Sequence, residues 1–237
     1  MKSRHFNIIE LLIIFVIIAI LAALLLPVLM KTKEKTRRIV CMNNLRQCGV
    51  ASVLYAKDNN GILNPTTGPH GTVQSLYWFG RITIERFKPY FDTWKITDCP
   101  SWEGKPTLGS GYPSQMRGSN MTGFIYSGGL DTTKLRPGAG DWWTSPKAMN
   151  DDPELMLWAD RIVTSVRYTG KYPHTSSGWH EAPRRPWQYN PDEFGNEGGN
   201  VFNLDGSAKW VSQKIMTAQK ADSVARRVVN WWRVEAD

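Results

Sequence analysis

The sequence is poor in cysteine and histidine, and it contains only one long apolar run. Three cysteines in 237 residues are too few for a disulfide-rich scaffold, and a single apolar run excludes a multispanning membrane protein. Charged residues make up 21% and hydrophobic residues 41%, proportions that exclude a disordered or collagen-like chain. The length suits one domain, or one modest domain with an appendage.

Net positive charge is concentrated in the N-terminal region. The formal net charge is +8, and residues 1–38 supply +5 of it through seven Lys or Arg and two Glu. The rest of the chain has a net charge of only +3. Because nucleic-acid binding needs a basic surface, we expect no nucleic-acid partner.

Recognisable enzyme motifs are absent as well. The sequence has no Gly-x-Ser-x-Gly, His-Glu-x-x-His, P-loop or Rossmann pattern. Its one acidic-imidazole group is His180-Glu181 with Asp192, Glu193 and Glu197, and nothing fixes the geometry of these residues, so solvated loop positions are the favoured interpretation. We predict no enzyme activity, no catalytic residue, no cofactor and no metal ion.

The apolar run is long enough to cross a membrane. Leu11–Leu26 is unbroken, and Ile8–Leu29 covers 22 positions interrupted only by Glu10 and Pro27. A helix of that length spans about 33 Å, against about 30 Å for the hydrocarbon core of a bilayer. A cleaved signal peptide is the alternative, but its apolar region is usually about 7–15 residues and ends at a small-residue cleavage site. We predict a retained transmembrane helix over residues 6–30, kinked at Pro27.

Helical periodicity continues over residues 31–60. One stripe at a spacing of 3.6 residues contains Cys41, Leu45, Cys48, Tyr55 and Ala56. The Asn-Asn-Gly sequence at 59–61 is a typical helix stop. We therefore predict a single helix of about 50 residues whose second half packs one face on a globular body.

Glu10 is an unusual residue in this setting. A carboxylate at the bilayer centre costs about 2.5–3.5 kcal/mol, and less near the interface. Glu10 either sits at headgroup depth, where it complements the helix dipole, or pairs with a cation on a neighbouring chain. Composition alone leaves both interpretations open.

The segment from Phe6-Asn7-Ile8-Ile9-Glu10-Leu11-Leu12 to Pro27 resembles the N-terminus of prepilin-like proteins, the type IV pilins and type II secretion pseudopilins. In that family a prepilin peptidase cuts after a glycine and methylates the new N-terminal phenylalanine. The resemblance implies a cut between His5 and Phe6, methylation of Phe6, and a role for Glu10 in meeting the N-terminal amine of an adjacent subunit. His5 stands where the family has glycine, and its bulky imidazole disfavours cleavage.

The resemblance also implies a location. Family members are single-pass proteins of the bacterial inner membrane, with a cytoplasmic N-terminus and a periplasmic or extracytoplasmic domain. Local charge opposes this orientation, because Lys2 and Arg4 precede the helix whereas five basic residues follow it within residues 31–38. Long domains are translocated largely regardless of charge, so we adopt the orientation of the family.

Three later segments extend the resemblance to a prepilin-type group with a C-terminal H-x9-DG motif. They are Cys41-Met42-Asn43-Asn44-Leu45-Arg46-Gln47, Cys99-Pro100-Ser101, and Gly198-Gly199-Asn200-Val201 followed by Asp205-Gly206. Gly195 occupies the position of the motif histidine.

Residues 61–237 are expected to form an α+β domain in which the long helix packs on a small antiparallel sheet. Asp205-Gly206 between apolar runs predicts a hairpin with a type I′ turn. Residues 81–87 and 155–166 have strand or short-helix character. We expect a polar surface excursion over residues 168–200 and a C-terminal helix over residues 212–232.

The cysteines leave two alternatives. Cys41 and Cys48 lie about 10 Å apart along the helix, too far to bridge each other. In the first, Cys41 or Cys48 forms a disulfide with Cys99 in an oxidising periplasm. In the second, the three cysteines are buried thiols. A metal site is disfavoured because no Cys-x-x-Cys or neighbouring histidine accompanies them.

Two functions of different classes follow. The first is a structural subunit that associates with like subunits through its N-terminal helix. The second is a membrane-tethered binding module, for carbohydrate or another ligand, or an enzyme that keeps the prepilin-like segment only as an anchor.

Overall fold

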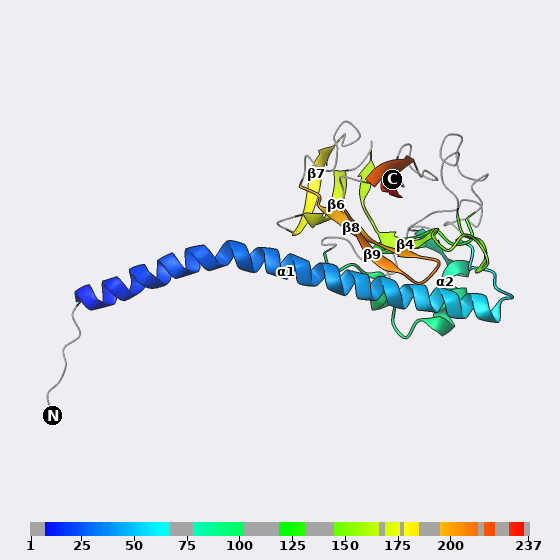
Figure 1. Ribbon diagram of the computed structural model, residues 1–237, viewed down its shortest axis with the longest axis horizontal. Coiled ribbons are helices and arrows are strands. Elements are labelled where there is room, and N and C mark those ends of the chain that lie inside the picture. Colours follow the sequence, from blue (N-terminus) through cyan, green and yellow to red (C-terminus); the bar gives the residue numbers. More distant parts are fainter. Residues whose placement is uncertain are drawn as a thin grey trace, which may run out of the picture.

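The computed structural model describes residues 8–66, 78–101, 119–130, 145–165, 169–175, 178–184, 195–212, 216–220 and 228–234. One long helix leads into a body built mainly of antiparallel strands, in agreement with the predicted α+β class. Figure 1 shows that the body gathers around the C-terminal half of the helix, while the N-terminal half projects away from it.

The long helix, α1 (Ile8–Asp58), has 51 residues and matches the predicted extent closely. Pro27 lies inside it without interrupting it, and the helix is bowed rather than straight (Figure 1). It ends where predicted, because Asn60 (φ 56°) and Gly61 (φ 78°) adopt the left-handed conformation. The Gly61 N–H then donates to the Ala56 carbonyl at 2.8 Å, a typical helix C-terminus.

The two halves of α1 differ in burial. Every residue from position 8 to position 33 is exposed, whereas a buried stripe begins at Glu34. The predicted stripe is confirmed, since Cys41, Leu45, Cys48, Tyr55 and Ala56 are all buried. We call residues 8–33 the apolar half and residues 34–58 the body half.

A four-stranded antiparallel sheet packs against the body half of α1. Its strand order is β3 (Phe124–Tyr126), β4 (Met156–Asp160), β8 (Gly198–Asn203) and β9 (Ala208–Ser212). Helix α1 packs directly against strands β8 and β4. This sheet confirms the predicted small antiparallel sheet, and β4 lies within residues 155–166, for which strand or short-helix character was expected.

Shorter elements close the other side of the core. Strands β1 (Trp78–Gly80) and β2 (Ser119–Met121) form an antiparallel pair. The helix α2 (Arg81–Phe87) follows β1 directly, and two 3-10 helices come after it, η1 (Lys88–Tyr90) and η2 (Trp94–Thr97).

A second, five-stranded sheet was not predicted. Its order is β10 (Met216–Lys220), β11 (Val228–Val234), β5 (Val163–Ser165), β6 (Thr169–Thr175) and β7 (Gly178–Arg184). The expected surface excursion over residues 168–200 is therefore wrong, because β6, β7 and part of β8 occupy it. The expected helix over residues 212–232 is also wrong. Residues 228–234 are rich in β-branched and aromatic side chains, which favour a strand.

The β8–β9 hairpin lies where Asp205-Gly206 predicts it, but its turn is of another type. Among the described residues of the turn only Gly206 has a positive φ, of 86°, whereas a type I′ turn needs two such residues. The Gly206 N–H donates to the Asn203 carbonyl (3.1 Å), and the Asn203 N–H donates to the Ser207 carbonyl (2.9 Å). The loop thus has three residues, and the Asp205 carboxylate accepts the Ser207 N–H at 2.7 Å.

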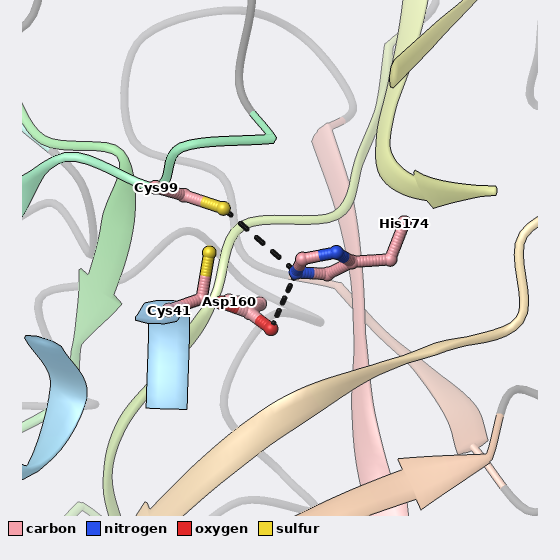
Figure 2. Close-up of side chains that lie close together, drawn as sticks. All are labelled: Cys41, Cys99, Asp160 and His174. Atoms are coloured by element: carbon pink, nitrogen blue, oxygen red, sulfur yellow. Dashed lines mark hydrogen bonds and ion pairs between the residues drawn. The ribbon is translucent and has the colours of Figure 1, made fainter. Parts of the chain in front are cut away.

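Strands from both sheets meet the helix at one place. β4 ends at Asp160, β6 carries His174, and both side chains lie beside Cys41 of α1 (Figure 2). This junction ties α1 and the two sheets together.

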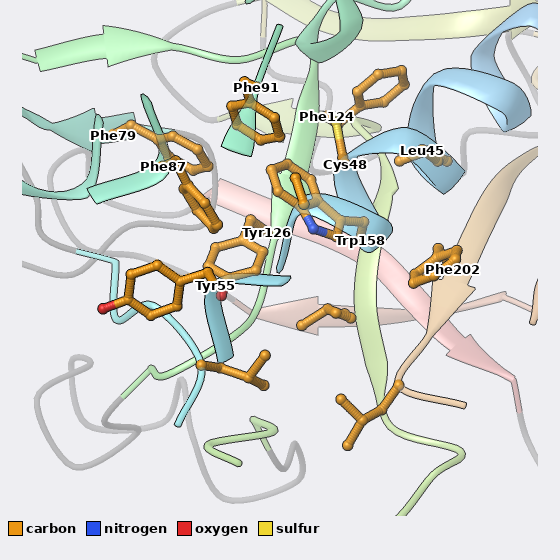
Figure 3. Close-up of a cluster of buried hydrophobic side chains, with 14 of the residues drawn as sticks. Leu45, Cys48, Tyr55, Phe79, Phe87, Phe91, Phe124, Tyr126, Trp158 and Phe202 are labelled. Carbon is orange, nitrogen blue, oxygen red and sulfur yellow. The ribbon is translucent and has the colours of Figure 1, made fainter. Parts of the chain in front are cut away.

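The hydrophobic core lies between α1, the four-stranded sheet and α2, and it is rich in aromatic rings (Figure 3). Trp158 and Tyr126 lie 4.7 Å apart between ring centroids, and the Trp158 indole N–H donates to the Ser52 hydroxyl at 2.9 Å. Gly49 allows the closest approach of the sheet, because a Cβ there would come 2.1 Å from the Phe202 ring.

Candidate functional site

The structure offers two places where function can be sought: the apolar half of α1 and a buried group of polar side chains. By length and composition, α1 is the one helix among the described residues that could cross a membrane, and it lies near the N-terminus. Its large apolar side chains are exposed over the whole range from Ile8 to Met30. Glu10 is exposed within this range, and His5 and Phe6 lie outside the described residues.

The buried group consists of Cys41, Cys99, Asp160 and His174, which we call the four-residue cluster. Their donor atoms, two sulfurs, one carboxylate oxygen and one imidazole nitrogen, all lie within 4.8 Å of one another. All four residues are buried, with at most 3% of any of them exposed. Figure 2 shows the four side chains converging from α1, the segment after η2, β4 and β6.

His174 occupies the centre of this arrangement. Its Nε2 lies 2.9 Å from Asp160 Oδ2 and 3.8 Å from Cys99 Sγ, and its Nδ1 lies 2.8 Å from Glu34 Oε1. Burial alone would lower the pKa of His174, but the negative charge of Asp160 outweighs it and raises the pKa well above its usual value. Both ring nitrogens also lie at hydrogen-bond distance from a carboxylate oxygen, Nδ1 from Glu34 and Nε2 from Asp160, and this geometry favours the protonated imidazolium.

Glu34 is a buried carboxylate held by several donors. The Ser101 hydroxyl lies 3.4 Å from both of its oxygens, and Arg38 Nε lies 3.5 Å from Oε1. Arg38 also pairs with Glu197 at 2.6 Å and lies over the Trp210 ring at 4.4 Å. The guanidinium is thus fixed on two sides, and it fixes Glu34 in turn.

Hydrogen bonds hold only one of the two carboxylate oxygens of Asp160. Its Oδ2 accepts the Asn200 backbone N–H at 2.6 Å and the Asn200 side-chain N–H at 2.8 Å. Its Oδ1 is buried and has no hydrogen-bond partner. A buried carboxylate oxygen without a hydrogen-bond partner is costly, so this oxygen calls for an explanation.

The three cysteines are free, buried thiols, in line with one of the two alternatives left by the sequence. Burial and the Cys99 contact raise the pKa of Cys41. Burial opposes ionisation of Cys99 as well, but the hydrogen bond from Cys41 and the charge of His174 lower its pKa overall. Cys99 is therefore the first of this pair to become a thiolate.

Cys48 stands apart from the cluster. Its thiol donates to the Ile96 carbonyl at 3.5 Å, and burial raises its pKa. It is a core residue on the same helix as Cys41, which makes it a natural control for experiments on the cluster.

The acidic-imidazole group suggested by the sequence is not assembled in the described residues. His180 and Glu181 lie in β7, and Asp192 and Glu193 lie outside the described residues. Glu197 pairs with Arg38 instead. Asp205 lies in the exposed hairpin turn, where hydrogen bonds from Ser207 lower the pKa of its carboxyl.

Sequence reasoning discounted a cysteine-based site because no histidine lies near the cysteines in the chain. His174 comes from β6, 75 residues beyond Cys99. One signal was available, because Glu34 lies seven residues before Cys41 and falls on the same buried helix stripe. A carboxylate on an apolar stripe indicates a buried partner.

Comparison with known proteins does not assign the chain. No family model, curated protein or solved structure matches it.

Proposed function

We propose that this protein is a membrane-anchored, pseudopilin-like structural subunit of a type II secretion or type IV pilus-like assembly. It associates with like subunits through the apolar half of α1. The observation that carries the proposal is the exposure of residues 8–33 on a helix whose other half is packed into the body. A soluble monomer would expose this whole apolar surface to water, which is strongly unfavourable.

The dimensions of the apolar half suit a bilayer. Ile8 to Met30 spans about 35 Å as a helix, slightly more than a hydrocarbon core of about 30 Å. Lys31, Lys33 and Lys35 follow directly, and their ammonium groups would reach the lipid headgroups. We place the N-terminus in the cytoplasm and the body outside it, as the resemblance to prepilins implies.

Glu10 supplies the specific contact in this proposal. It is an exposed acidic residue in the first turn of α1, and apolar residues surround it in the sequence. In an assembly, the free amine of Phe6 on an adjacent, processed subunit would lie against this carboxylate and offset the cost of placing it in lipid. Processing by prepilin peptidase at His5 is part of the proposal.

The experiment uses the full chain expressed in bacteria with an active prepilin peptidase. Mass spectrometry of the membrane-extracted protein should find a chain that begins at methylated Phe6. Cross-linking in membranes should give oligomers of the unaltered protein, at least tenfold fewer oligomers of Glu10→Ala, and unchanged membrane recovery of both.

Glu154→Ala is the matched control, because Glu154 is an exposed carboxylate on the body. It should leave the oligomers unchanged. Equal oligomer yields for Glu10→Ala and Glu154→Ala, or a chain that begins at Met1, would favour the membrane-tethered module instead. A chain that begins beyond residue 26 would contradict membrane anchoring altogether.

A further inference from the structure

We propose that Cys41, Cys99, Asp160 and His174 bind a divalent transition metal ion of the zinc type, and that this ion has a structural role. The inference concerns the body of the protein and does not depend on the assembly function proposed above.

The ligand set is the first argument. Thiolate, imidazole and carboxylate are all zinc ligands, and two thiolates, one imidazole and one carboxylate supply the four that tetrahedral zinc takes. With bond lengths of about 2.0–2.3 Å, tetrahedral ligand atoms lie roughly 3.3–3.8 Å apart. The four donor atoms here lie within 4.8 Å of one another, and Nε2 of His174 lies 2.9 Å from Oδ2 of Asp160. Shifts of about 1 Å or less, inward for the most distant atoms and slightly apart for this pair, therefore complete the coordination sphere.

The surroundings of His174 are the second argument. A metal-bound histidine usually donates its other ring N–H to a carboxylate, which fixes the ring and raises its basicity. His174 turns Nε2 toward the cluster and places Nδ1 2.8 Å from Glu34 Oε1. Ser101 and Arg38 hold Glu34 in this position.

The surroundings of Asp160 are the third argument. Asn200 donates twice to Oδ2, which fixes the carboxylate, while Oδ1 remains buried without a hydrogen-bond partner. A carboxylate ligand oriented by outer hydrogen bonds is another regular feature of metal sites. A cation bound in the cluster would offset the negative charge of this buried carboxylate.

Binding of the metal ion releases protons from its ligands. Written with a protonated His174, an ionised Asp160 and two thiols, the metal-free cluster has no net charge. The divalent ion replaces the Nε2 proton of His174 and the thiol protons of Cys41 and Cys99, so three protons leave and no electron is transferred. The loaded cluster has a net charge of −1.

Burial decides between a structural and a catalytic role. A catalytic zinc keeps one coordination position open for water or substrate, whereas four protein ligands close the site. All four ligands are buried, and they come from α1, the segment after η2, β4 and β6. The ion would therefore connect the long helix to both large sheets.

The test uses the full-length protein in detergent, reduced and stripped with a chelator. Titration with Zn²⁺ should give one tightly bound ion per chain, and X-ray absorption should find two sulfur and two nitrogen or oxygen ligands. Titration with Co²⁺ should give the intense visible bands of tetrahedral cobalt and a thiolate-to-cobalt charge-transfer band.

Variants locate the site. Cys41→Ser, Cys99→Ser and His174→Gln should each weaken zinc binding at least tenfold, and Glu34→Gln should weaken it roughly 10–100-fold through the orientation of His174. Cys48→Ser should bind zinc like the unaltered protein, because Cys48 lies outside the cluster. Glu10→Ala should also bind normally, which separates this proposal from the assembly function.

Measurements on the unaltered protein keep the test independent of how the variants fold. The proposal would be overturned by a reduced chain that binds no stoichiometric zinc or cobalt. A cobalt spectrum without thiolate ligands would overturn it too, as would a Cys41–Cys99 disulfide in the metal-free protein isolated from cells. The proposal would also be overturned if a folded Cys41→Ser/Cys99→Ser double variant bound zinc as tightly as the unaltered protein.

Discussion

The two halves of α1 belong to one uninterrupted helix but differ in what surrounds them. The apolar half carries hydrophobic side chains on all sides and buries none of them, whereas the body half buries a single stripe. A helix that is apolar all around is suited to lipid or to neighbouring helices, and one with a single stripe is suited to one protein surface. The distribution of apolar residues around the helix therefore identifies its surroundings better than their number does.

This difference in burial also predicts which half of α1 stabilises the folded body. The body half contributes Leu45, Cys48 and Tyr55 to the core, while no side chain of the apolar half contributes to it. Equivalent substitutions in the two halves should therefore have unequal effects on the unfolding of the body.

The largest difference is expected for a matched pair of leucines. Leu45→Ala should lower the free energy of unfolding by about 2–5 kcal/mol, because it leaves a cavity in the core. Leu21→Ala should leave it unchanged, because Leu21 is 54% exposed and outside the body. Thermal unfolding in detergent, followed by near-ultraviolet circular dichroism, measures both. Equal losses for the two variants would show that the halves are not energetically separate.

A smaller difference is expected for a pair of hydroxyls that both donate to the carbonyl four residues earlier. Ser52 donates to Cys48 and also accepts the Trp158 indole N–H at 2.9 Å, so Ser52→Ala leaves a buried donor unpaired. That should cost about 1–3 kcal/mol. Thr32 donates to Val28 in the exposed half, and Thr32→Ala should be close to neutral. Chemical denaturation with tryptophan fluorescence measures the difference, and a neutral Ser52→Ala would contradict the role of this hydrogen bond.

The smallest effect is expected at the two positions that shape the helix backbone. Gly61→Ala should cost roughly 1–2 kcal/mol, because Gly61 has a left-handed conformation at the end of the body half. Pro27→Ala should leave the unfolding of the body unchanged, because Pro27 lies in the apolar half. Chemical denaturation with tryptophan fluorescence measures the free energy of unfolding of both variants. A loss of stability in Pro27→Ala would show that the bend of α1 is coupled to the body.

Much of the fold could be predicted because it depends on local signals. Apolar periodicity predicts α1 and its buried stripe, the Asn-Asn-Gly sequence predicts its end, and Asp205-Gly206 predicts the hairpin. The five-stranded sheet depends instead on pairings between distant segments, such as Val163 with Asn230, which no local pattern reveals. The turn type was missed because the contact of Asp205 with the Ser207 N–H favours a longer loop.

The four-residue cluster could not be predicted for a similar reason. The sequence indicated Cys41 and Cys99 only as a possible disulfide and disfavoured a metal site, because the residues that complete the cluster arrive on β4 and β6. The pairing of β6 within the second sheet, together with the bridge between Thr175 and Asn196, brings His174 to the helix. Glu34 was the one residue whose position on the helix stripe indicated a buried polar site.

The uninterrupted helix also makes α1 a lever. From Met30 to Asp58 the helix extends about 42 Å, and the body is attached along most of that length. In the proposed membrane placement, a tilt of about 10° within the bilayer would move the far end of the body by about 7 Å. Small changes of angle at the membrane would thus become large displacements of the surface that the protein presents outside it.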